Sequence, residues 1–348
     1  MKISFILPIK NEYLFICGTL DRILNQTIIN DIDLEIIIAD GESTDGSIEL
    51  IQQYINKYKF IKLINNKKQI VSYGFNIALN EAKGDIIIRI DGHSEIPPNY
   101  VEKCISILQN NKIDIAGGMV ETIASGNIGK AIAIAQSSLF GVGGVKFRDK
   151  NYNKSTYVNT LAFGAHKRDI FYEIGGYDVE MIYNQDDEFN LRAIQAGKKI
   201  WMDSDIKTKY YSRSSFSKLF KQYFNYGCYK VRGIQKRKQL ISIRHLIPAT
   251  FVITLIGTLL SGYYLHQPSL SFSILSTYLL INTFSSIILS PAISLIPLVF
   301  LSFWVLHLSY GFGFLWGLIR FASKWGDTKL KDDHFNREKF IANSAITI

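Results

Sequence analysis

One long stretch of this chain carries no charged side chain. From Leu246 to Ile319 the sequence contains no Asp, Glu, Lys or Arg, whereas charged residues make up about a quarter of an ordinary chain. A helical crossing of a bilayer needs about 20 predominantly apolar residues. The stretch therefore predicts transmembrane helices, about three by length and between two and four in all, and this is a better explanation than a buried all-helical core.

The flanks of this stretch leave the number of crossings open. Lys and Arg occur on both sides of it, and because positive charge marks the cytoplasmic side of a membrane segment, this favours an even number. Length favours three. The two indications agree if residues 308–318, which are rich in Gly and aromatic residues, lie in the membrane interface. Breaks between helices are expected at residues 266–268, Pro291 and Pro297.

Residues 206–245, directly before this stretch, contain eleven Lys and Arg and no Asp or Glu, interleaved with aromatic residues. Nucleic-acid binding is one interpretation of such a pattern. Next to a membrane region, an interfacial amphipathic segment on anionic lipid explains it better. The same charges indicate that the N-terminal side of the first crossing is cytoplasmic. Residues 320–348 are expected to form a C-terminal tail.

The N-terminal residues and the cysteines also indicate a cytoplasmic domain. The apolar run at 3–9 is short, contains Pro8 and is followed by charged residues, unlike a secretory signal. The three cysteines are scattered, without the spacing of a disulfide framework or a metal site. We therefore expect a multi-pass protein of the cell (inner) membrane whose N-terminal domain is cytoplasmic.

Residues 1–205 have the pattern of an α/β domain. Short apolar runs at 3–7, 34–39, 60–64 and 85–90 alternate with segments of helical length and period. Near-continuous Ile, Leu and Val runs are typical of parallel strands covered on both faces, and strand–helix–strand spacing indicates βαβ units. Open α/β sheets bind ligands beyond the carboxyl ends of their strands. The polar residues that follow each run should therefore converge on one crevice.

Three of these runs are followed by acidic residues. Glu12 follows the first run, Asp40 begins an acid-rich turn after the second, and Asp91-Gly92-His93 follows the fourth. Each alone has a plain structural explanation, since Asp-Gly is a common turn and an Asp before a helix can cap it. Together they favour a binding crevice. Carboxylates that face the phosphates of a nucleotide would require a divalent cation between them, and hard cations take oxygen ligands.

Five motifs in this order resemble the family 2 glycosyltransferases of the GT-A fold. They read PxxNE at 8–12, DGESTDG at 40–46, RIDGH at 89–93, FGAHKR at 163–168 and QDDEFNLR at 185–192. The chain looks closest to the membrane-bound branch that assembles bacterial polysaccharides, such as the succinoglycan-type transferases. The resemblance covers residues 1 to about 240. It implies a GT-A catalytic domain over 1–205, with a Rossmann-like, mostly parallel sheet and helices on both faces.

The resemblance also implies roles for residues that match the family's motifs. Glu12 and Asp40 match residues that contact the uracil and ribose of a nucleotide sugar. Asp91 matches the first acid of the D-x-D motif, which bridges the donor diphosphate through Mg²⁺ or Mn²⁺. His93 replaces the last acid of that motif, and histidine suits Mn²⁺ better than Mg²⁺. The implied metal ligands are Asp91 and His93, and the implied nucleotide-sugar-binding residues are Pro8, Glu12, Asp40, Asp91, Gly164 and Ala165.

Two further motifs match the sugar side of the family's site. Gly164, Ala165 and His166 match a segment of small residues that faces donor sugar and acceptor, although close packing would also explain Gly164 and Ala165. Asp186 matches the catalytic base, with Gln185 in place of the family's glutamate. Without the motif order, the three consecutive acids from 186 would be explained as the dipole-favoured first turn of a helix.

Residues next to the implied base are expected to have structural roles. Asp187 is expected to be solvated. Glu188 and Arg192 are expected to pair, because they lie four apart on one helical face.

The predicted function is that of an inverting hexosyltransferase in cell-surface polysaccharide assembly. It would move a sugar from a nucleotide sugar to a hydroxyl of a saccharide or lipid-linked saccharide, and the expected donor is a UDP-sugar. Membrane lipid is expected as a further partner, and nucleic acid is not. One alternative is a processive polysaccharide synthase, although the Q-x-x-R-W motif of such enzymes is missing. The other is a catalytically silent protein that binds nucleotide sugars, which His93 and Gln185 favour and Asp186 argues against.

Overall fold

The computed structural model describes residues 1–110, 112–149, 152–240, 242–264, 266 and 268–345. The chain divides into two compact units. The first, the sheet unit, comprises residues 1–121, 151–210 and 329–348, and the second, the helical unit, comprises 122–150 and 211–328. This division differs from the predicted boundaries, because 122–150 group with the apolar helices and the C-terminal tail groups with the sheet.

The first half of the sheet is built from the four predicted apolar runs. The strands lie in the order β3-β2-β1-β4 and are all parallel. Their isoleucines are mostly buried, as expected for strands with helices on both faces. The bounds are β1 (Lys2–Ile9), β2 (Asp33–Asp40), β3 (Ile61–Asn65) and β4 (Ile86–Arg89).

The second half of the sheet is mixed. β8 (Ala165–Lys167) lies next to β4 and runs antiparallel both to it and to β6 (Ile115–Ile123). The long strand β9 (Ile200–Tyr211) pairs antiparallel with β5 (Ser94–Glu95) and β7 (Thr156–Val158). The predicted α/β fold is confirmed, and the parallel arrangement is confined to part of the sheet.

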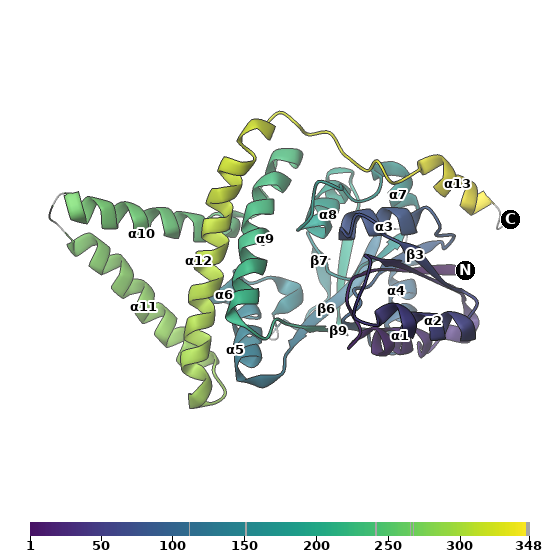
Figure 1. Ribbon diagram of the computed structural model, residues 1–348, viewed down its shortest axis with the longest axis horizontal. Helices are drawn as coiled ribbons and strands as arrows, with labels where there is room; N and C mark the ends of the chain where they lie inside the picture. The colour runs from purple at the N-terminus through teal and green to yellow at the C-terminus, as the bar shows by residue number, and fades with distance from the viewer. Residues whose placement is uncertain (111, 150–151, 241, 265, 267, 346–348) are drawn as a thin grey trace. The chain divides into compact units, whose positions relative to one another are not determined.

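Helices cover both faces of the parallel strands, with α1 and α2 on one face and α3 on the other (Figure 1). Apolar residues recur along these helices at helical spacing, as at Ile16, Leu20 and Ile23 of α1, and these are fully buried. The helices of the sheet unit are α1 (Ile16–Leu24), η1 (Ile29–Asp31), α2 (Ser47–Lys57), α3 (Val71–Leu79), α4 (Tyr100–Leu108), α7 (Asp169–Ile174), α8 (Gln185–Gln195) and α13 (Arg337–Ala345).

The helical unit contains the charge-free stretch and the segments that pack on it. Its described residues include three helices long and apolar enough to cross a membrane, at Ile243–Tyr264, Ser269–Leu289 and Ile293–Arg320. The elements of this unit are α5 (Gly126–Gln136), α6 (Leu139–Val142), η2 (Lys146–Arg148), α9 (Phe216–Arg237), η3 (Ile243–His245), α10 (Ile247–Tyr264), α11 (Ser269–Leu289), η4 (Ile293–Leu295), α12 (Ile296–Arg320) and η5 (Ala322–Lys324).

The predicted helix breaks agree with these bounds. His266 and Pro268 lie between α10 and α11, whereas Gln267 lies outside the described residues. Pro291 lies between α11 and η4. Pro297 is in the first turn of α12, where the missing N–H of proline costs no helical hydrogen bond.

Candidate active site

The carboxyl ends of β1, β2 and β4 lie at one edge of the sheet. In the parallel register Ile9 is opposite Asp40, and Arg89, the last residue of β4, is opposite Ile6 of β1. The chain builds β2 and β3 on one side of β1 and then places β4 on the other side. This is a topological switch point, where open α/β sheets bind ligands. The predicted residues Glu12, Asp40 and Asp91 follow or end these strands and therefore lie at the same edge.

A contact between Glu12 and His93 joins the loops on the two sides of the switch point. Oε1 of Glu12 lies 2.7 Å from Nδ1 of His93. The backbone N–H of Glu12 donates to Oγ of Ser47 at 2.9 Å, which ties the loop to the start of α2. Gly92 allows this approach, because a Cβ at that position would lie 2.8 Å from Cγ of Glu12. Two residues predicted for separate tasks thus form one pair.

Asp40 directs its carboxylate into its own loop. The residue is 4% exposed, and its two carboxylate oxygens accept hydrogen bonds from the backbone N–H of Ser43 at 2.9 Å and from the Ser43 hydroxyl at 2.5 Å. These bonds hold the turn that follows β2. Any contact of Asp40 with a ribose would therefore use carboxylate oxygens that already accept hydrogen bonds from Ser43.

Arg89, which the sequence did not single out, is the centre of a buried charge cluster. Its Nη2 donates to Oδ1 of Asp91 at 2.6 Å, and its guanidinium lies 5.8 Å from the centre of the Tyr177 ring. Burial opposes the charge of Arg89, but Asp91, Tyr177 and Asp186 outweigh burial and raise the guanidinium pKa. A lone arginine at the end of an apolar strand could have indicated this cluster from the sequence, because a charge is rarely buried without a partner.

Asp186 belongs to the same cluster and lies in the first turn of α8. The helix begins after Asn184, whose backbone is left-handed with φ 57°. Burial, followed by repulsion from Asp187, raises the pKa of the Asp186 carboxyl, and Arg89 acts against this rise. A raised pKa makes a carboxylate a better proton acceptor at physiological pH. The predicted base and the predicted metal-motif acid are thus linked electrostatically through Arg89.

The other acids of this turn have structural partners. The predicted pair is confirmed, because Nε and Nη2 of Arg192 each lie 3.0 Å from a carboxylate oxygen of Glu188, and both side chains are buried. The prediction that Asp187 is solvated is wrong. Asp187 is half-buried, and its Oδ1 accepts a hydrogen bond from the hydroxyl of Thr160 at 2.7 Å, a residue far from it in sequence.

The remaining predicted residues are packed within the sheet unit. Pro8 is buried in β1. Ala165 is fully buried in β8, between β4 and β6, so packing accounts for its small side chain. A Cβ at Gly164 would lie 3.0 Å from Cε1 of His166. Burial lowers the pKa of His166 to about 4, so this imidazole is neutral at physiological pH, and the structure makes it a packing residue.

The donor set at this edge fits a divalent cation that is shared with a bound ligand. No group of three or more His, Cys, Asp and Glu side chains among the described residues is arranged to hold a metal ion. Arg89 engages Oδ1 of Asp91, and because Glu12 engages Nδ1 of His93, coordination by His93 would use Nε2. One carboxylate and one imidazole would leave the other coordination positions to diphosphate oxygens and water.

Comparisons with known proteins identify the family of the chain. The family model Glycosyl transferase family 2 matches residues 4–175. A Methanococcus voltae protein, the dolichyl N-acetyl-alpha-D-glucosaminyl phosphate 3-beta-D-2,3-diacetamido-2,3-dideoxy-beta-D-glucuronosyltransferase, is 30% identical over 327 residues, which are 91% of this chain and 97% of the relative. The succinoglycan biosynthesis protein ExoA of Rhizobium meliloti is 29% identical over 261 residues, which are 74% of this chain and 77% of ExoA.

Among solved structures, the fold is similar to that of a mannosyltransferase from Pyrobaculum calidifontis in complex with GDP-Man and Mn²⁺. The TM-score is 0.58 at 15% sequence identity, and the match covers 90% of this chain and 87% of the mannosyltransferase. This likeness confirms the predicted GT-A fold. With a relative that is 30% identical over nearly the full length and a family model that matches residues 4–175, the chain belongs to glycosyl transferase family 2 and is a glycosyltransferase of glycan biosynthesis.

Proposed function

We propose that this glycosyltransferase moves a hexosyl group from a UDP-sugar to a hydroxyl of a saccharide or lipid-linked saccharide, with inversion, at the cytoplasmic face of the cell membrane. The observation that carries the proposal is the buried cluster around Arg89. In this cluster Arg89 bonds to Asp91, the proposed acid on the diphosphate side, and its charge acts on the pKa of Asp186, the proposed base. The attacking hydroxyl and the leaving diphosphate of a displacement reaction would thus each have a residue of suitable chemistry.

Asp186 would take the proton of the acceptor hydroxyl as its oxygen attacks the anomeric carbon. The bond from that carbon to the diphosphate oxygen breaks in the same step. A positioned base contributes roughly 10²–10⁴-fold to such a reaction, and the raised pKa of Asp186 suits the task. One displacement inverts the anomeric configuration, and it needs no second carboxylate as nucleophile.

On the leaving-group side, Asp91 and His93 are the residues that would hold a divalent cation with the donor. When bound, such a cation supplies several kcal/mol of charge stabilisation to the departing diphosphate. The imidazole favours Mn²⁺ over Mg²⁺, and the similar mannosyltransferase was solved with Mn²⁺. Arg89 would keep Asp91 in position, and Glu12 would orient the ring of His93, as second-shell carboxylates do for metal-bound histidines.

Two observations support a lipid-linked acceptor and addition of a single sugar. The name of the Methanococcus voltae relative describes a dolichyl-linked sugar phosphate as its substrate. The described part of this chain includes three membrane-capable helices, which would hold the enzyme where such lipids are. The Q-x-x-R-W motif of processive synthases is missing from the sequence.

Incubating membranes with a panel of radiolabelled nucleotide sugars, lipid extract and Mn²⁺ tests the proposal. We expect transfer from a UDP-sugar, with one sugar added to each acceptor. Long products would support the processive alternative. Binding of UDP-sugar without transfer to any acceptor in the extract would support the silent binder and contradict the proposal.

Two substitutions of His93 separate its two ring nitrogens. Asparagine places its amide near the position of Nδ1 and can keep the bond to Glu12, but it removes Nε2. Glutamine reaches the position of Nε2 and loses the Nδ1 contact. We expect His93→Asn to weaken Mn²⁺-dependent UDP binding, measured by calorimetry, by roughly 10- to 100-fold, and His93→Gln to weaken it less. Equal binding by both variants and the wild type would exclude His93 as a ligand.

A further inference from the structure

We propose that the hydrophobic region crosses the bilayer twice, through α10 and α11, and that α12 lies along the cytoplasmic surface of the membrane beside α9. The inference rests on the membrane location proposed above but is independent of donor and acceptor. It assigns α9 and α12 to the surface that contacts lipid headgroups.

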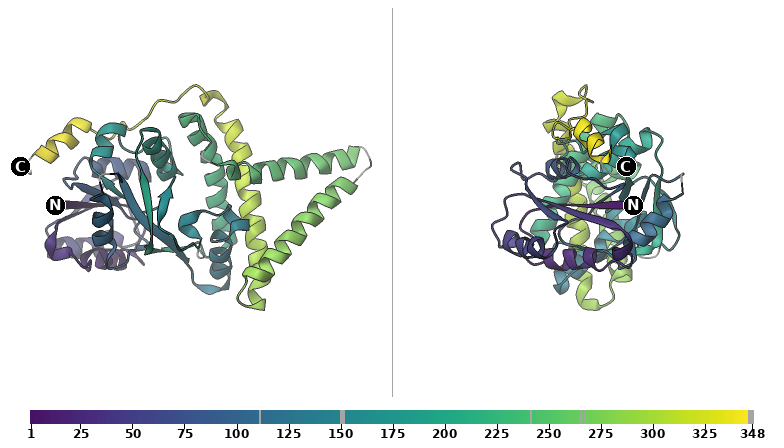
Figure 2. Two further views of the ribbon diagram at one scale, coloured as in Figure 1. Left: turned by 180° about the vertical axis from the view of Figure 1, so that it is seen from behind. Right: turned by 90° about the vertical axis from the view of Figure 1, so that its right-hand side faces the viewer.

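The first observation is that the chain returns to the sheet unit after α12. Phe340 of α13 is fully buried, and the guanidinium of Arg168 lies 3.6 Å from the centre of its ring. Asn80 donates to the carbonyl of His334 at 2.8 Å and accepts from the N–H of Asn336 at 2.7 Å. Figure 2 shows α13, in yellow, against the other elements of the sheet unit. Because the segments before and after the hydrophobic region fold into one unit, both lie on one side of the membrane and the number of crossings is even.

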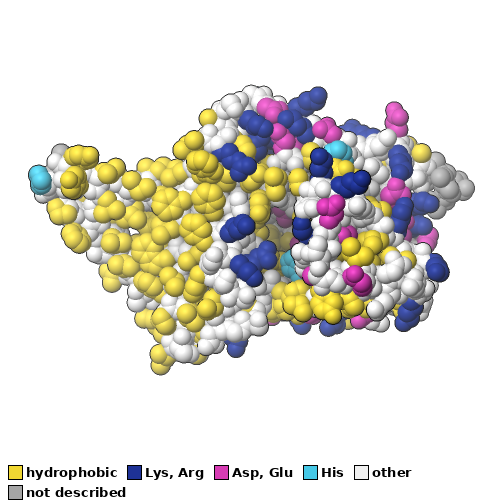
Figure 3. Space-filling view, viewed as in Figure 1, with side chains coloured by type: hydrophobic (Ala, Val, Ile, Leu, Met, Phe, Trp, Pro, Cys, Tyr) yellow, Lys and Arg dark blue, Asp and Glu magenta, His cyan; other side chains and the backbone are white. Residues whose placement is uncertain are grey.

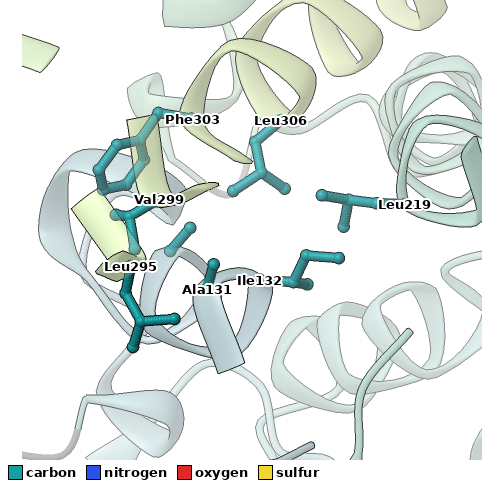
Figure 4. Close-up of a cluster of buried hydrophobic side chains, with 8 residues drawn as sticks. Ala131, Ile132, Leu219, Leu295, Val299, Phe303 and Leu306 are labelled. Carbon is teal, nitrogen blue, oxygen red and sulfur yellow. The ribbon is translucent and has the colours of Figure 1, made fainter. Parts of the chain in front are cut away.

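The second observation is that the first half of α12 packs on segments that precede the hydrophobic region. A single buried cluster joins α5, α9, η4 and α12 (Figure 4). Its largest members come from all four elements. They are Ile132, Leu219, Leu295, Val299, Phe303 and Leu306.

The rest of α12 also follows these segments closely. A Cβ at Gly313 would lie 2.0 Å from the carbonyl oxygen of Phe224 in α9, so the two backbones touch. Near the middle of α12, Nε2 of His307 lies 2.8 Å from the carbonyl oxygen of Phe140 in α6. Beyond its end, Arg232 of α9 donates to Oδ2 of Asp327 at 2.9 Å. From beginning to end, α12 is attached to α5, α6 and α9, and Figure 1 shows it running beside α9.

The composition of α9 keeps it out of the hydrocarbon layer. Charged side chains at the bilayer centre are costly and rare, whereas an amphipathic cationic helix suits an interface with anionic lipid. A helix that follows α9 over its length stays at the same depth. Figure 3 shows the hydrophobic surface of the helical unit bordered by Lys and Arg. The exposed cationic residues of α9 are Lys218 and Lys221, whereas Lys230, Arg232 and Lys236 are buried.

By contrast, α10 and α11 have the properties of a spanning hairpin. At 1.5 Å per residue they are about 27 and 32 Å long, close to the roughly 30 Å hydrocarbon thickness. One polar contact joins the two helices, since the hydroxyl of Ser271 donates to the carbonyl of Thr258 at 2.6 Å. Tyr278 and Asn282 of α11 bond instead to His307 and to the carbonyl of Phe300 in α12. Tyr263 and Tyr264, at the turn of the hairpin, are 76% and 74% exposed, as expected for aromatic residues at the far interface.

Labelling of single cysteines in the full-length protein tests this topology. A Cys17→Ala background removes the partly exposed native thiol, since Cys104 and Cys228 are buried. Exposed positions for the new cysteines are Pro268 at the hairpin turn, Ala292 before α12 and Asp333 in the tail. A membrane-impermeant maleimide should label Pro268→Cys in intact spheroplasts. It should label Ala292→Cys and Asp333→Cys only after the membrane is permeabilised.

Asp31→Cys, exposed in the sheet unit, is the cytoplasmic reference for this experiment. Labelling of Asp333→Cys in intact spheroplasts while Asp31→Cys is protected would require an odd number of crossings and would overturn the proposal. Labelling of Ala292→Cys from outside would make α12 a spanning helix and also overturn it, as would protection of Pro268→Cys. Labelling needs no catalytic activity, so these outcomes are distinct from a failure of the proposed function.

Discussion

Asp186→Asn should lower kcat by roughly 10²-fold or more while donor affinity changes little. Asparagine keeps the shape of the side chain and its acceptor oxygen, so the hydrogen bond from the backbone N–H of Asp187 at 2.9 Å can remain. It cannot accept the proton of the acceptor hydroxyl. In the proposed mechanism the loops of Asp91 and Glu12, and not Asp186, hold the donor. Transfer assays and UDP-binding titrations on the same preparations measure the two effects separately.

The stability of Asp186→Asn distinguishes lost catalysis from lost folding. Burial raises the pKa of Asp186 in the folded state above its unfolded value. The stabilising contribution of such a group is fully present below the unfolded pKa and is lost as pH rises through the folded pKa. At neutral pH the ionised Asp186 therefore lowers the free energy of unfolding of the wild type, whereas asparagine is neutral at every pH. The variant should melt at the same temperature as the wild type or higher.

Asp187→Asn is the matched control. Asparagine at 187 retains an oxygen that can accept the hydrogen bond from Thr160, so activity should stay within a few-fold of wild type. An inactive Asp187→Asn beside an active Asp186→Asn would move the base by one residue. Full activity of both variants would place the base elsewhere.

Arg89→Met should strongly destabilise the sheet unit and reduce transfer. Methionine fills much of the space but leaves Asp91 and Asp186 without their shared cation. Breaking a buried ion pair from one side costs about 3–5 kcal/mol, and the lower end of this range applies because the side chain of Asp91 is 24% exposed. A lower melting temperature, with transfer reduced even where the variant is folded, is the expected result.

Two companion variants make the Arg89 result specific. Arg22 pairs with Glu95 at 3.6 Å on the surface and is 49% exposed, so Arg22→Met should cost less than about 1 kcal/mol. The double variant Arg89→Met, Asp91→Asn removes both charges and should regain part of the stability but none of the activity. If Arg89→Met melted like Arg22→Met, the cluster would not hold the site together.

The parallel half of the sheet and its ligand-binding edge were predictable because their signals are local. Each apolar run forms a strand by its own composition, and the residues after it must lie at its carboxyl end. The pairing of Glu12 with His93 was not predictable, since the residues come from different loops that meet only when β4 is placed beside β1. The interaction of Asp186 with Arg89 was not predictable for the same reason, since the two residues lie far apart in the sequence.

Other elements were missed because their sequences resemble ordinary surface structure. β8 has only three residues, Ala165–Lys167, and no apolar run. The tail is mostly polar, and the apolar side chains Phe335 and Phe340 are buried. Residues 126–136 have the pattern of a typical covering helix of an α/β domain, yet they pack against α12. In each case the partner is distant in sequence and leaves no local pattern.

The anomeric configuration of the product shows whether the transfer is a single displacement with Asp186 as the base. With the donor found in the nucleotide-sugar panel, the reaction product can be isolated and the coupling constant at its new anomeric centre measured by NMR. An α-linked UDP-sugar should give a β-linked product, because in the proposed mechanism Asp186 activates the acceptor for one in-line displacement. An α-linked product would show net retention and would contradict the assignment of Asp186 as the base of a single displacement.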